Sequence, residues 1–138
     1  MTGTYQHLID SKGRISVPSR LREDLGETFY VTMSMNKCLT AYPMNIWSKF
    51  EEKASAMPLV KQNKMRPLFA NALKCDVDPQ GRILLTQALR DIAGLKKNVT
   101  FVSVGTYVEL WDSETWSPIA VEENTSDKLA EVLTELEF

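Results

Sequence analysis

The chain has 138 residues and a mass of 15.7 kDa, the size of one compact domain or two very small ones, which excludes a large enzyme with separate cofactor and substrate lobes. Apolar residues make up 43% and charged residues 25% of the sequence, an ordinary globular composition that excludes a disordered chain. The net charge of −2 excludes a uniformly basic coat for nucleic acid.

The charge is nevertheless polarised along the chain. Residues 1–68 carry 10 basic and 6 acidic side chains, whereas residues 69–138 carry 6 basic and 12 acidic ones. Two cysteines, Cys38 and Cys75, are too few for a disulfide framework, so both are expected to be reduced thiols of an intracellular protein. The sequence shows no secretory leader and no apolar run of membrane-spanning length, so neither secretion nor membrane insertion is expected.

The main signal is an internal repeat. Shifting the chain by 68 residues aligns positions 7–33 with positions 75–101, and 9 of the 27 pairs are identical. After one extra residue in the second copy, the match resumes at an offset of 69 and pairs aromatic residues. Each unit is too small to bury a core alone, so the two are expected to pack together about a pseudo-two-fold axis. The matching pairs are Asp10/Asp78, Gly13/Gly81, Arg14/Arg82, Ile15/Ile83, Leu21/Leu89, Arg22/Arg90, Gly26/Gly94, Val31/Val99 and Thr32/Thr100, then Tyr42/Trp111 and Trp47/Trp116.

Each unit is predicted to open with a β-hairpin. Short strands at 5–9 and 73–77 enter turns with Asp at the first position and Gly at the fourth, as in type I turns. The returning strands follow at once and should bury alternate residues. Those strands are residues 14–17, with Ile15 and Val17 on one face and Arg14 and Ser16 on the other, and residues 82–85.

A short helix follows in each unit. Pro18 or Thr86 begins it, and Gly26 or Gly94 ends it. Its core face is expected to consist of Leu21 and Leu25 in the first unit and of Leu89 and Ile92 in the second. A second hairpin should then form from strands at 29–33 and 38–42 in the first unit, and at 99–104 and 107–111 in the second, with turns at Asn36 and Gly105.

Helices are also predicted between and after the units. Pro43 can open one helix with Trp47, Phe50 and Ala54 along one stripe, and Pro67 should kink or restart another that carries Met65, Leu68, Phe69 and Ala72. Met57-Pro58 separates the two. The acidic tail, opened by Ser126, spaces Leu129, Val132, Leu133 and Leu136 at helical intervals. It is either a solvated helix, a subunit contact or an autoinhibitory segment that competes with DNA.

The sequence contains few of the residue patterns that a catalytic site requires. His7 is the only histidine, so a Ser-His-Asp or Cys-His arrangement has no spare base, and there is no Gly-rich phosphate loop. His7 and Cys75 occupy equivalent repeat positions, but two ligands do not make a zinc site. Both are interpreted as strand side chains near the pseudo-axis. The aromatic residues Tyr42, Trp47, Trp111 and Trp116 are interpreted as core rather than as base-stacking platforms.

A cluster of basic side chains is a better candidate for a functional site than the catalytic or metal-binding groups. Lys12, Arg14, Arg20 and Arg22 lie within eleven residues, while the second copy keeps Arg82 and Arg90 and replaces the other two with Gln80 and Ala88. Arginine can bind guanine edges bidentately, and lysine attracts phosphates. Turn geometry alone also explains the Asp and Gly residues, and an ion pair with Asp is about as good an explanation of Arg14 and Arg82 as a DNA contact.

The sequence resembles the bacterial MraZ family over nearly its whole length. The resemblance rests on His7-Leu-Ile-Asp-Ser-Lys-Gly-Arg-Ile-Ser-Val-Pro18 with Leu21-Arg22, and on its echo Cys75-Asp-Val-Asp-Pro-Gln-Gly-Arg-Ile83. Further matching stretches are Cys38-Leu-Thr-Ala-Tyr-Pro43 with Trp47, and Val108-Glu-Leu-Trp111 with Trp116. The chain departs from the family pattern at Thr2 and Pro67, which affects the expected subunit contacts more than the fold.

The resemblance implies an α+β, mainly β, fold in which two SpoVT-AbrB-type units form one swapped-hairpin barrel, with short helices between and after them. It implies a cytoplasmic, nucleoid-associated transcription regulator of the division and cell-wall gene cluster, acting as a ring-like homo-oligomer on promoter repeats without a cofactor. The expected segments are unit 1 at 5–47, a helical linker at 48–74, unit 2 at 75–119 and an acidic helix at 122–138.

The resemblance attributes DNA binding to the two Asp-to-Arg loops, here Asp10 with Arg14 and Asp78 with Arg82. Together with the basic cluster, this gives the expected DNA-binding residues Lys12, Arg14, Arg20, Arg22 and Arg82, with Asp10, Gly13, Asp78 and Gly81 supporting the turns. The rival hypothesis is an oligomeric scaffold whose basic loops meet an acidic protein. An enzyme ranks third.

Overall fold

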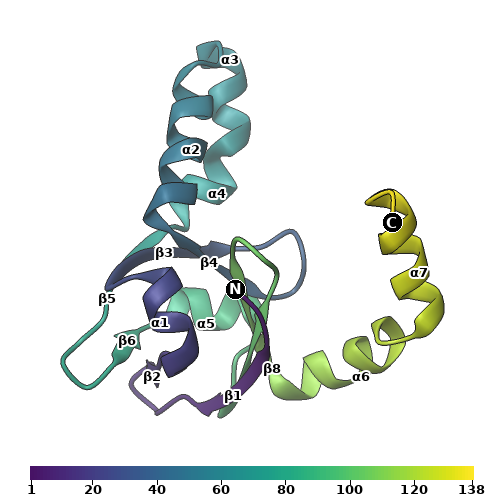
Figure 1. Cartoon of the computed structure of the whole chain (residues 1–138). Coiled ribbons are helices and arrows are strands. Elements are labelled where there is room, and N and C mark those ends of the chain that lie inside the picture. Colours follow the sequence, from purple (N-terminus) through teal and green to yellow (C-terminus); the bar gives the residue numbers. More distant parts are fainter.

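A computed structural model describes residues 1–138 and shows a β-rich body from which two helical segments project (Figure 1). The first projection, here called the arm, spans residues 44–70. It consists of α2 (Met44–Ser55), α3 (Leu59–Gln62), a 3-10 turn (Asn63–Met65) and α4 (Arg66–Ala70). The second, here called the tail, spans residues 113–138 and contains α6 (Ser113–Glu123) and α7 (Ser126–Glu135).

Strands and two short helices make up the body, so the α+β class is confirmed. The strands are β1 (Thr4–Leu8), β2 (Arg14–Ser16), β3 (Thr28–Met33), β4 (Leu39–Pro43), β5 (Leu73–Asp76), β6 (Arg82–Leu84), β7 (Asn98–Ser103) and β8 (Val108–Asp112). The helices are α1 (Ser19–Leu25) and α5 (Gln87–Ala93).

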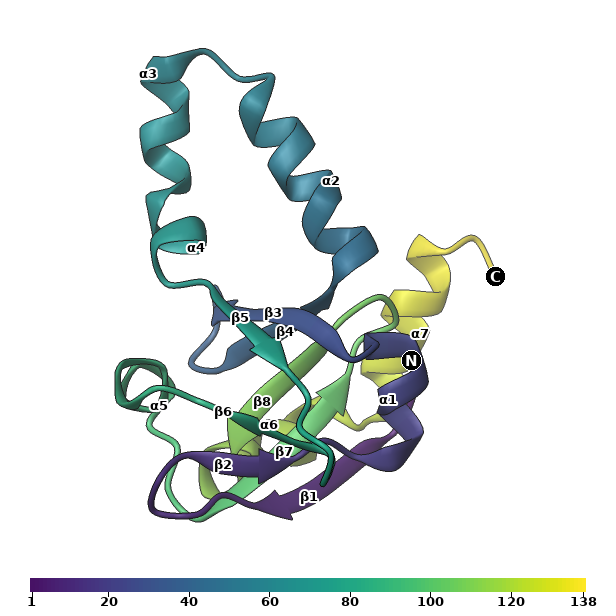
Figure 2. The ribbon, with the colours of Figure 1, turned by 90° about the vertical axis from the view of Figure 1, so that its left-hand side faces the viewer.

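The two repeats share their sheets. The larger sheet has the order β1-β7-β8-β4-β3-β5, and the smaller one pairs β2 with β6; every pairing is antiparallel. His7 of β1 lies opposite Val99 of the second repeat, and Cys75 of β5 lies opposite Phe29 of the first. Each repeat therefore completes the other's sheet, as Figure 2 shows for β1, β2 and β6.

The predicted opening hairpins are wrong as strand pairs, although their turns form. In the first repeat only the bridge from Ile9 to Ile15 joins the two strands, and Arg14 instead lies opposite Leu84 of β6. A two-stranded hairpin of this length is marginal by itself. Pairing with strands of the other repeat provides more backbone hydrogen bonds and a shared core, because both repeats bury their apolar faces together.

The core draws equally on both repeats. Ile15 and Val17 are buried on the predicted face. The helix faces at Leu21, Leu25 and Leu89 are confirmed as well. Ile92, however, is 41% exposed, and Ala93 is buried in its place because Ala93 lies one full turn after Leu89.

The helix ends follow the predicted signals. Thr86 caps α5 by accepting a hydrogen bond from Leu89 N at 3.3 Å, and Gly94 ends it in the left-handed conformation, with φ of 60°. Pro18 precedes α1, and Pro67 lies in the first turn of α4, where its missing N–H costs nothing. The tail differs slightly, because Thr125 rather than Ser126 caps α7.

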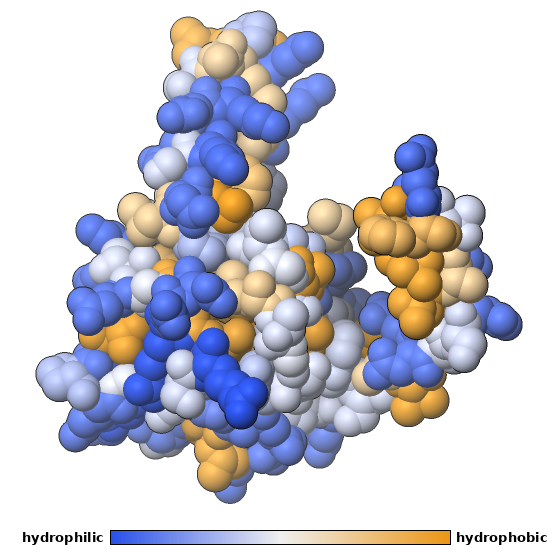
Figure 3. Space-filling model, viewed as in Figure 1, coloured by the Kyte–Doolittle hydropathy of each residue, from blue (hydrophilic) through white to orange (hydrophobic).

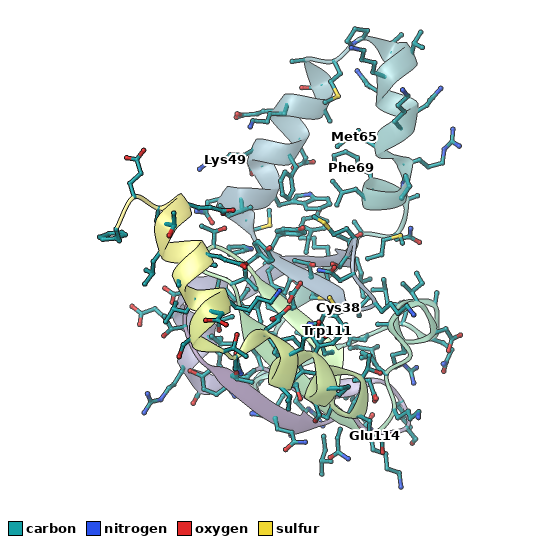
Figure 4. The ribbon with its side chains drawn as sticks, turned by 90° about the vertical axis from the view of Figure 1, so that its right-hand side faces the viewer. Cys38, Lys49, Met65, Phe69, Trp111 and Glu114 are labelled. Carbon is teal, nitrogen blue, oxygen red and sulfur yellow. The ribbon has the colours of Figure 1, made fainter.

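Aromatic packing fixes the root of the arm. Trp47 of α2 is buried and stacks on Tyr30 of β3, with ring centroids 4.6 Å apart. Phe69 of α4 meets the same indole edge-on at 5.4 Å, and Figure 4 shows Met65 and Phe69 directed towards α2. Trp111 is buried beneath Trp116 in the second repeat. The interpretation of the tryptophans as core residues is confirmed for Trp47 and Trp111.

No helix is both long and apolar enough to cross a bilayer.

Candidate functional site

The two Asp-to-Arg loops have the same internal geometry. In the first loop, Asp10–Arg14, one Asp10 carboxylate oxygen accepts hydrogen bonds from the backbone N–H groups of Lys12 and Arg14, both at 2.9 Å. The other oxygen accepts from Arg14 Nε at 2.9 Å. In the second loop, Asp78–Arg82, the corresponding donors are Gln80 N and Arg82 N, both at 2.9 Å, and Arg82 Nε at 3.1 Å.

Both aspartates are therefore held in their ionised form. The backbone N–H of Arg14 is the main cause that lowers the pKa of Asp10, and the Arg14 guanidinium adds to it. The same contacts from Arg82 lower the pKa of Asp78. Each aspartate thus serves as the acceptor around which its loop is folded. The two arginine side chains remain accessible, with Arg14 40% and Arg82 32% exposed.

Each loop is braced by the opposite repeat. Leu85 N donates to Gly13 O at 2.8 Å, and Val17 N donates to Gly81 O at 2.9 Å. These reciprocal bonds connect the turn of one repeat with the strand end of the other. The loops consequently have a fixed position relative to one another, which an isolated hairpin would not have.

Arginines of α1 and α5 cross between the repeats in the same way. Arg22 donates from Nε to Val17 O at 3.0 Å, and its guanidinium lies over Gly81 of the second loop. Arg90 donates from Nε to Leu85 O at 3.2 Å and lies beside Gly13 of the first loop. The basic cluster of the sequence is therefore divided in space, because Arg22 flanks the second loop and Arg90 replaces it beside the first.

A hollow of about 550 Å³ beside the first loop gathers cations from both repeats. We call it the cationic hollow. The backbone bond from Ile9 N to Lys97 O, 2.9 Å long, holds the adjacent Lys96-Lys97 segment against this loop. Asp10 is the only acidic lining residue, and the basic ones are Arg14, Arg82, Arg90, Lys96 and Lys97.

The equivalent hollow beside the second loop, of about 700 Å³, has the opposite character. Here Val77 N donates to Glu27 O at 2.8 Å, so a glutamate occupies the place that a lysine has beside the first loop. Arg22 is the only basic residue lining this acidic hollow, against Glu23, Glu27 and Asp78. The pseudo-symmetric fold thus carries two loops with unlike electrostatic surroundings.

The structure divides the predicted site residues between these places. Arg14 and Arg82 line the cationic hollow together, although they come from different repeats. Lys12 is exposed in the first loop, Arg20 is exposed on α1, and Arg22 lines the acidic hollow. Sequence reasoning did not assign Arg90, Lys96 and Lys97 to the site. The equivalence of Arg90 with Arg22 and the basic pair that follows Gly94 were the available signals.

His7 and Cys75 are strand residues with local partners. His7 Nδ1 lies 2.8 Å from Ser16 O, and its ring contacts Phe101 edge-on at 5.7 Å. Cys75 is buried on β5, at the other end of the strand order from β1. No group of three or more His, Cys, Asp or Glu side chains is placed to hold a metal ion.

Comparison with known proteins places the chain in one family. The family model described as "MraZ protein, putative antitoxin-like" matches twice, over residues 1–66 and 68–135. The transcriptional regulator MraZ of Caldicellulosiruptor saccharolyticus is 40% identical over 99% of this chain and 98% of its own length. The transcriptional regulators MraZ of Acetivibrio thermocellus and Carboxydothermus hydrogenoformans are 42% and 45% identical, over 97% and 83% of this chain and 96% and 82% of their own lengths. The chain belongs to the MraZ family, whose curated relatives are transcriptional regulators.

Proposed function

We propose that the chain is a sequence-specific DNA-binding transcriptional regulator without enzymatic activity, which contacts duplex DNA through its first loop and the cationic hollow. The observation that carries this proposal is the convergence of five cationic side chains from both repeats, Arg14 among them, on a hollow in which Asp10 is the only acidic lining residue. Two of these cations also have acidic partners outside the lining, because Arg82 pairs with Asp78 and Lys96 with Glu114. Such a surface attracts a phosphate backbone, whereas the net charge of the whole chain does not.

Arg14 is the proposed base-reading residue. Its ion pair with Asp10 uses Nε, which leaves Nη1 and Nη2 for an incoming acceptor. A guanidinium fixed in this way loses little conformational entropy on binding, and it can donate two parallel hydrogen bonds to the O6 and N7 atoms of guanine. Asp10 therefore positions the arginine, and Gly13 permits the turn.

The remaining cations are proposed as phosphate contacts. Lys12 at the loop tip and Arg82 in the hollow supply sequence-independent attraction, which fixes the position of the loop on the duplex. Arg20 and Arg22 contribute from α1, and Arg22 lies beside the second loop. Asp78 and Gly81 maintain that loop in the way that Asp10 and Gly13 maintain the first.

The assembly is proposed to be a ring of identical chains that engages repeated promoter elements. A subunit with a few useful cations binds weakly, but linked subunits bind neighbouring elements with a large gain in effective concentration. We also propose that the shared sheets close into the swapped-hairpin barrel of SpoVT-AbrB-type proteins, and that the protein acts in the cytoplasm at the nucleoid. The proposed targets are promoters of the division and cell-wall gene cluster.

The test is DNA affinity as a function of salt for wild type and Arg14→Ala, with the oligomer size checked for both. Losing one phosphate contact should reduce the slope of log affinity against log salt by about 0.9, and losing a base contact should reduce discrimination between promoter and random duplex. An unchanged affinity, slope and discrimination would remove Arg14 from the site. Equal binding of all duplexes by wild type would favour the scaffold hypothesis.

A further inference from the structure

The tail exposes an apolar stripe that nothing in the chain covers. Leu129, Val132 and Leu133 of α7 and Leu136 directly after it recur at helical spacing, and each is between 39 and 61% exposed. Figure 3 shows hydrophobic surface gathered on one side of the tail. No residue of α7 is buried. Because a helix of ten residues is marginal in water by itself, a partner that covers this stripe would also stabilise the helix.

The arm exposes a second apolar surface at its tip. Leu59 and Val60, at the start of α3, are 79% and 82% exposed, and the neighbouring Met57 is partly exposed. Figures 1 and 3 place this tip at the far end of the arm, away from the body. Apolar side chains gathered at the end of a projection are typical of a contact surface rather than of a folded core.

The two projections carry opposite charge. The arm, residues 44–70, has five basic and two acidic side chains, whereas the tail, residues 113–138, has seven acidic and one basic. Lys53 and Lys61 flank the arm tip in sequence, and Glu131 and Glu135 lie within α7. Opposite charges around two apolar surfaces favour their encounter and disfavour contact of either surface with its own kind.

Within one chain, the arm and the tail cannot cover each other's apolar surfaces. Figure 1 shows that they leave the body on different sides and stand well apart. We propose that the apolar stripe of α7 packs on the arm tip of a second copy of this chain. The inference deepens the proposed function, because it rests on the homo-oligomer proposed there and assigns its contact surface.

The contact is heterologous, since each copy offers two different surfaces. A copy whose tail is docked still has a free arm tip, so the contact propagates from copy to copy until it closes on itself. A closed ring is the expected outcome when the rotation between neighbours allows closure. No residue of the arm or the tail lines the cationic hollow, although Glu114 at the start of α6 lies 3.7 Å from Lys96 Nζ. The arm tip and the α7 stripe are therefore separate from the proposed DNA contact.

The first test measures mass in solution by light scattering. Leu133→Glu with Leu136→Glu should disable the tail, and Leu59→Glu with Val60→Glu should disable the arm tip. All four side chains are exposed, so the variants should fold like wild type. We expect an oligomeric wild type and single-chain mass for each variant. Val121→Glu, at an exposed apolar position of α6 outside the stripe, is the matched control and should leave the mass unchanged.

The second test mixes the two double variants. The tail variant keeps an intact arm tip and the arm variant keeps an intact tail, so the mixture should give a species of twice the single-chain mass and no larger one. If tails paired with tails, the arm variant would oligomerise alone. A monomeric wild type, variants that keep the full oligomer, or a mixture that stays monomeric would overturn the inference.

Affinity for a duplex with one promoter element separates this inference from the proposed function. The variants should keep the single-element affinity of wild type, because the cationic hollow is intact. A wild type that is monomeric and still binds its element would overturn the tail-to-arm contact and leave the DNA proposal standing. An arm variant with wild-type mass and weakened single-element binding would show that the basic arm contacts nucleic acid instead.

Discussion

Arg22 lies across Gly81, so that an arginine of the first repeat covers the turn of the second. The relation is reciprocal, because Arg90 of the second repeat lies beside Gly13 of the first. A side chain at Gly81 would overlap the Arg22 guanidinium, and one at Gly13 would overlap the backbone oxygen of Leu85. The glycines of the two loops are therefore required by the packing between repeats as well as by their turns.

Three glycine substitutions should separate these two requirements. Gly13, Gly81 and Gly105 all have positive φ, of 93°, 79° and 79°, but only the first two face close neighbours. Gly105→Ala should lose about 1 kcal/mol of unfolding free energy from backbone strain alone. Gly81→Ala should lose more, and Gly13→Ala most, because a guanidinium can move aside more easily than a backbone carbonyl. Urea unfolding measures the three values, and equal losses would contradict the packing argument.

The loop aspartates should make stability depend on pH. Both have a pKa below the usual carboxyl value, so they stabilise the folded chain above the pKa of an unfolded aspartate, and this contribution is lost as the pH falls through the folded value. Asp10→Asn and Asp78→Asn should therefore be less stable than wild type at pH 7. Their difference from wild type should shrink as the pH falls below about 4, because a protonated aspartate resembles asparagine. Urea unfolding from pH 7 to pH 2.5 follows the difference, which would stay constant if the carboxylate charge were irrelevant.

The two thiols should be inert in the folded chain. Burial is the main cause that raises the pKa of Cys38 and of Cys75, in each case to about 12. Thiolates are the reactive form, so almost none is available at pH 8. A disulfide reagent should label both residues only as fast as the structure opens, and immediately in urea. Rapid labelling of the native chain at either cysteine would contradict the burial.

The unlike hollows should respond differently to charge removal. Lys96→Gln with Lys97→Gln removes two cations from the cationic hollow and should weaken DNA binding. The slope of log affinity against log salt should decrease by about 0.9 for each phosphate contact that is lost. Glu23→Gln with Glu27→Gln makes the matched change in the acidic hollow, where Arg22 is the one proposed phosphate contact and the glutamates make none. Its affinity should be unchanged or slightly higher. Loss of binding in the glutamate variant would assign the DNA contact to the second loop instead.

Local sequence signals were sufficient for the turns and for most of the elements. The caps at Thr86 and Gly94, the buried face of Ile15 and Val17, and the restart of the helix at Pro67 all follow from residues close in sequence. The duplication also indicated that the two units pack together. These features are decided within a few residues of the chain, where capping, alternation and proline geometry act.

Pairing between the repeats was decided only by the tertiary structure. Nothing near Arg14 in the sequence shows that its strand pairs with β6, that Arg22 crosses to the second loop, or that Lys96 and Lys97 stand beside the first. A repeated sequence offers each strand two nearly equivalent partners, one in its own unit and one in the other. The choice between them depends on the burial and hydrogen bonding of the whole body, which are properties of the packed chain.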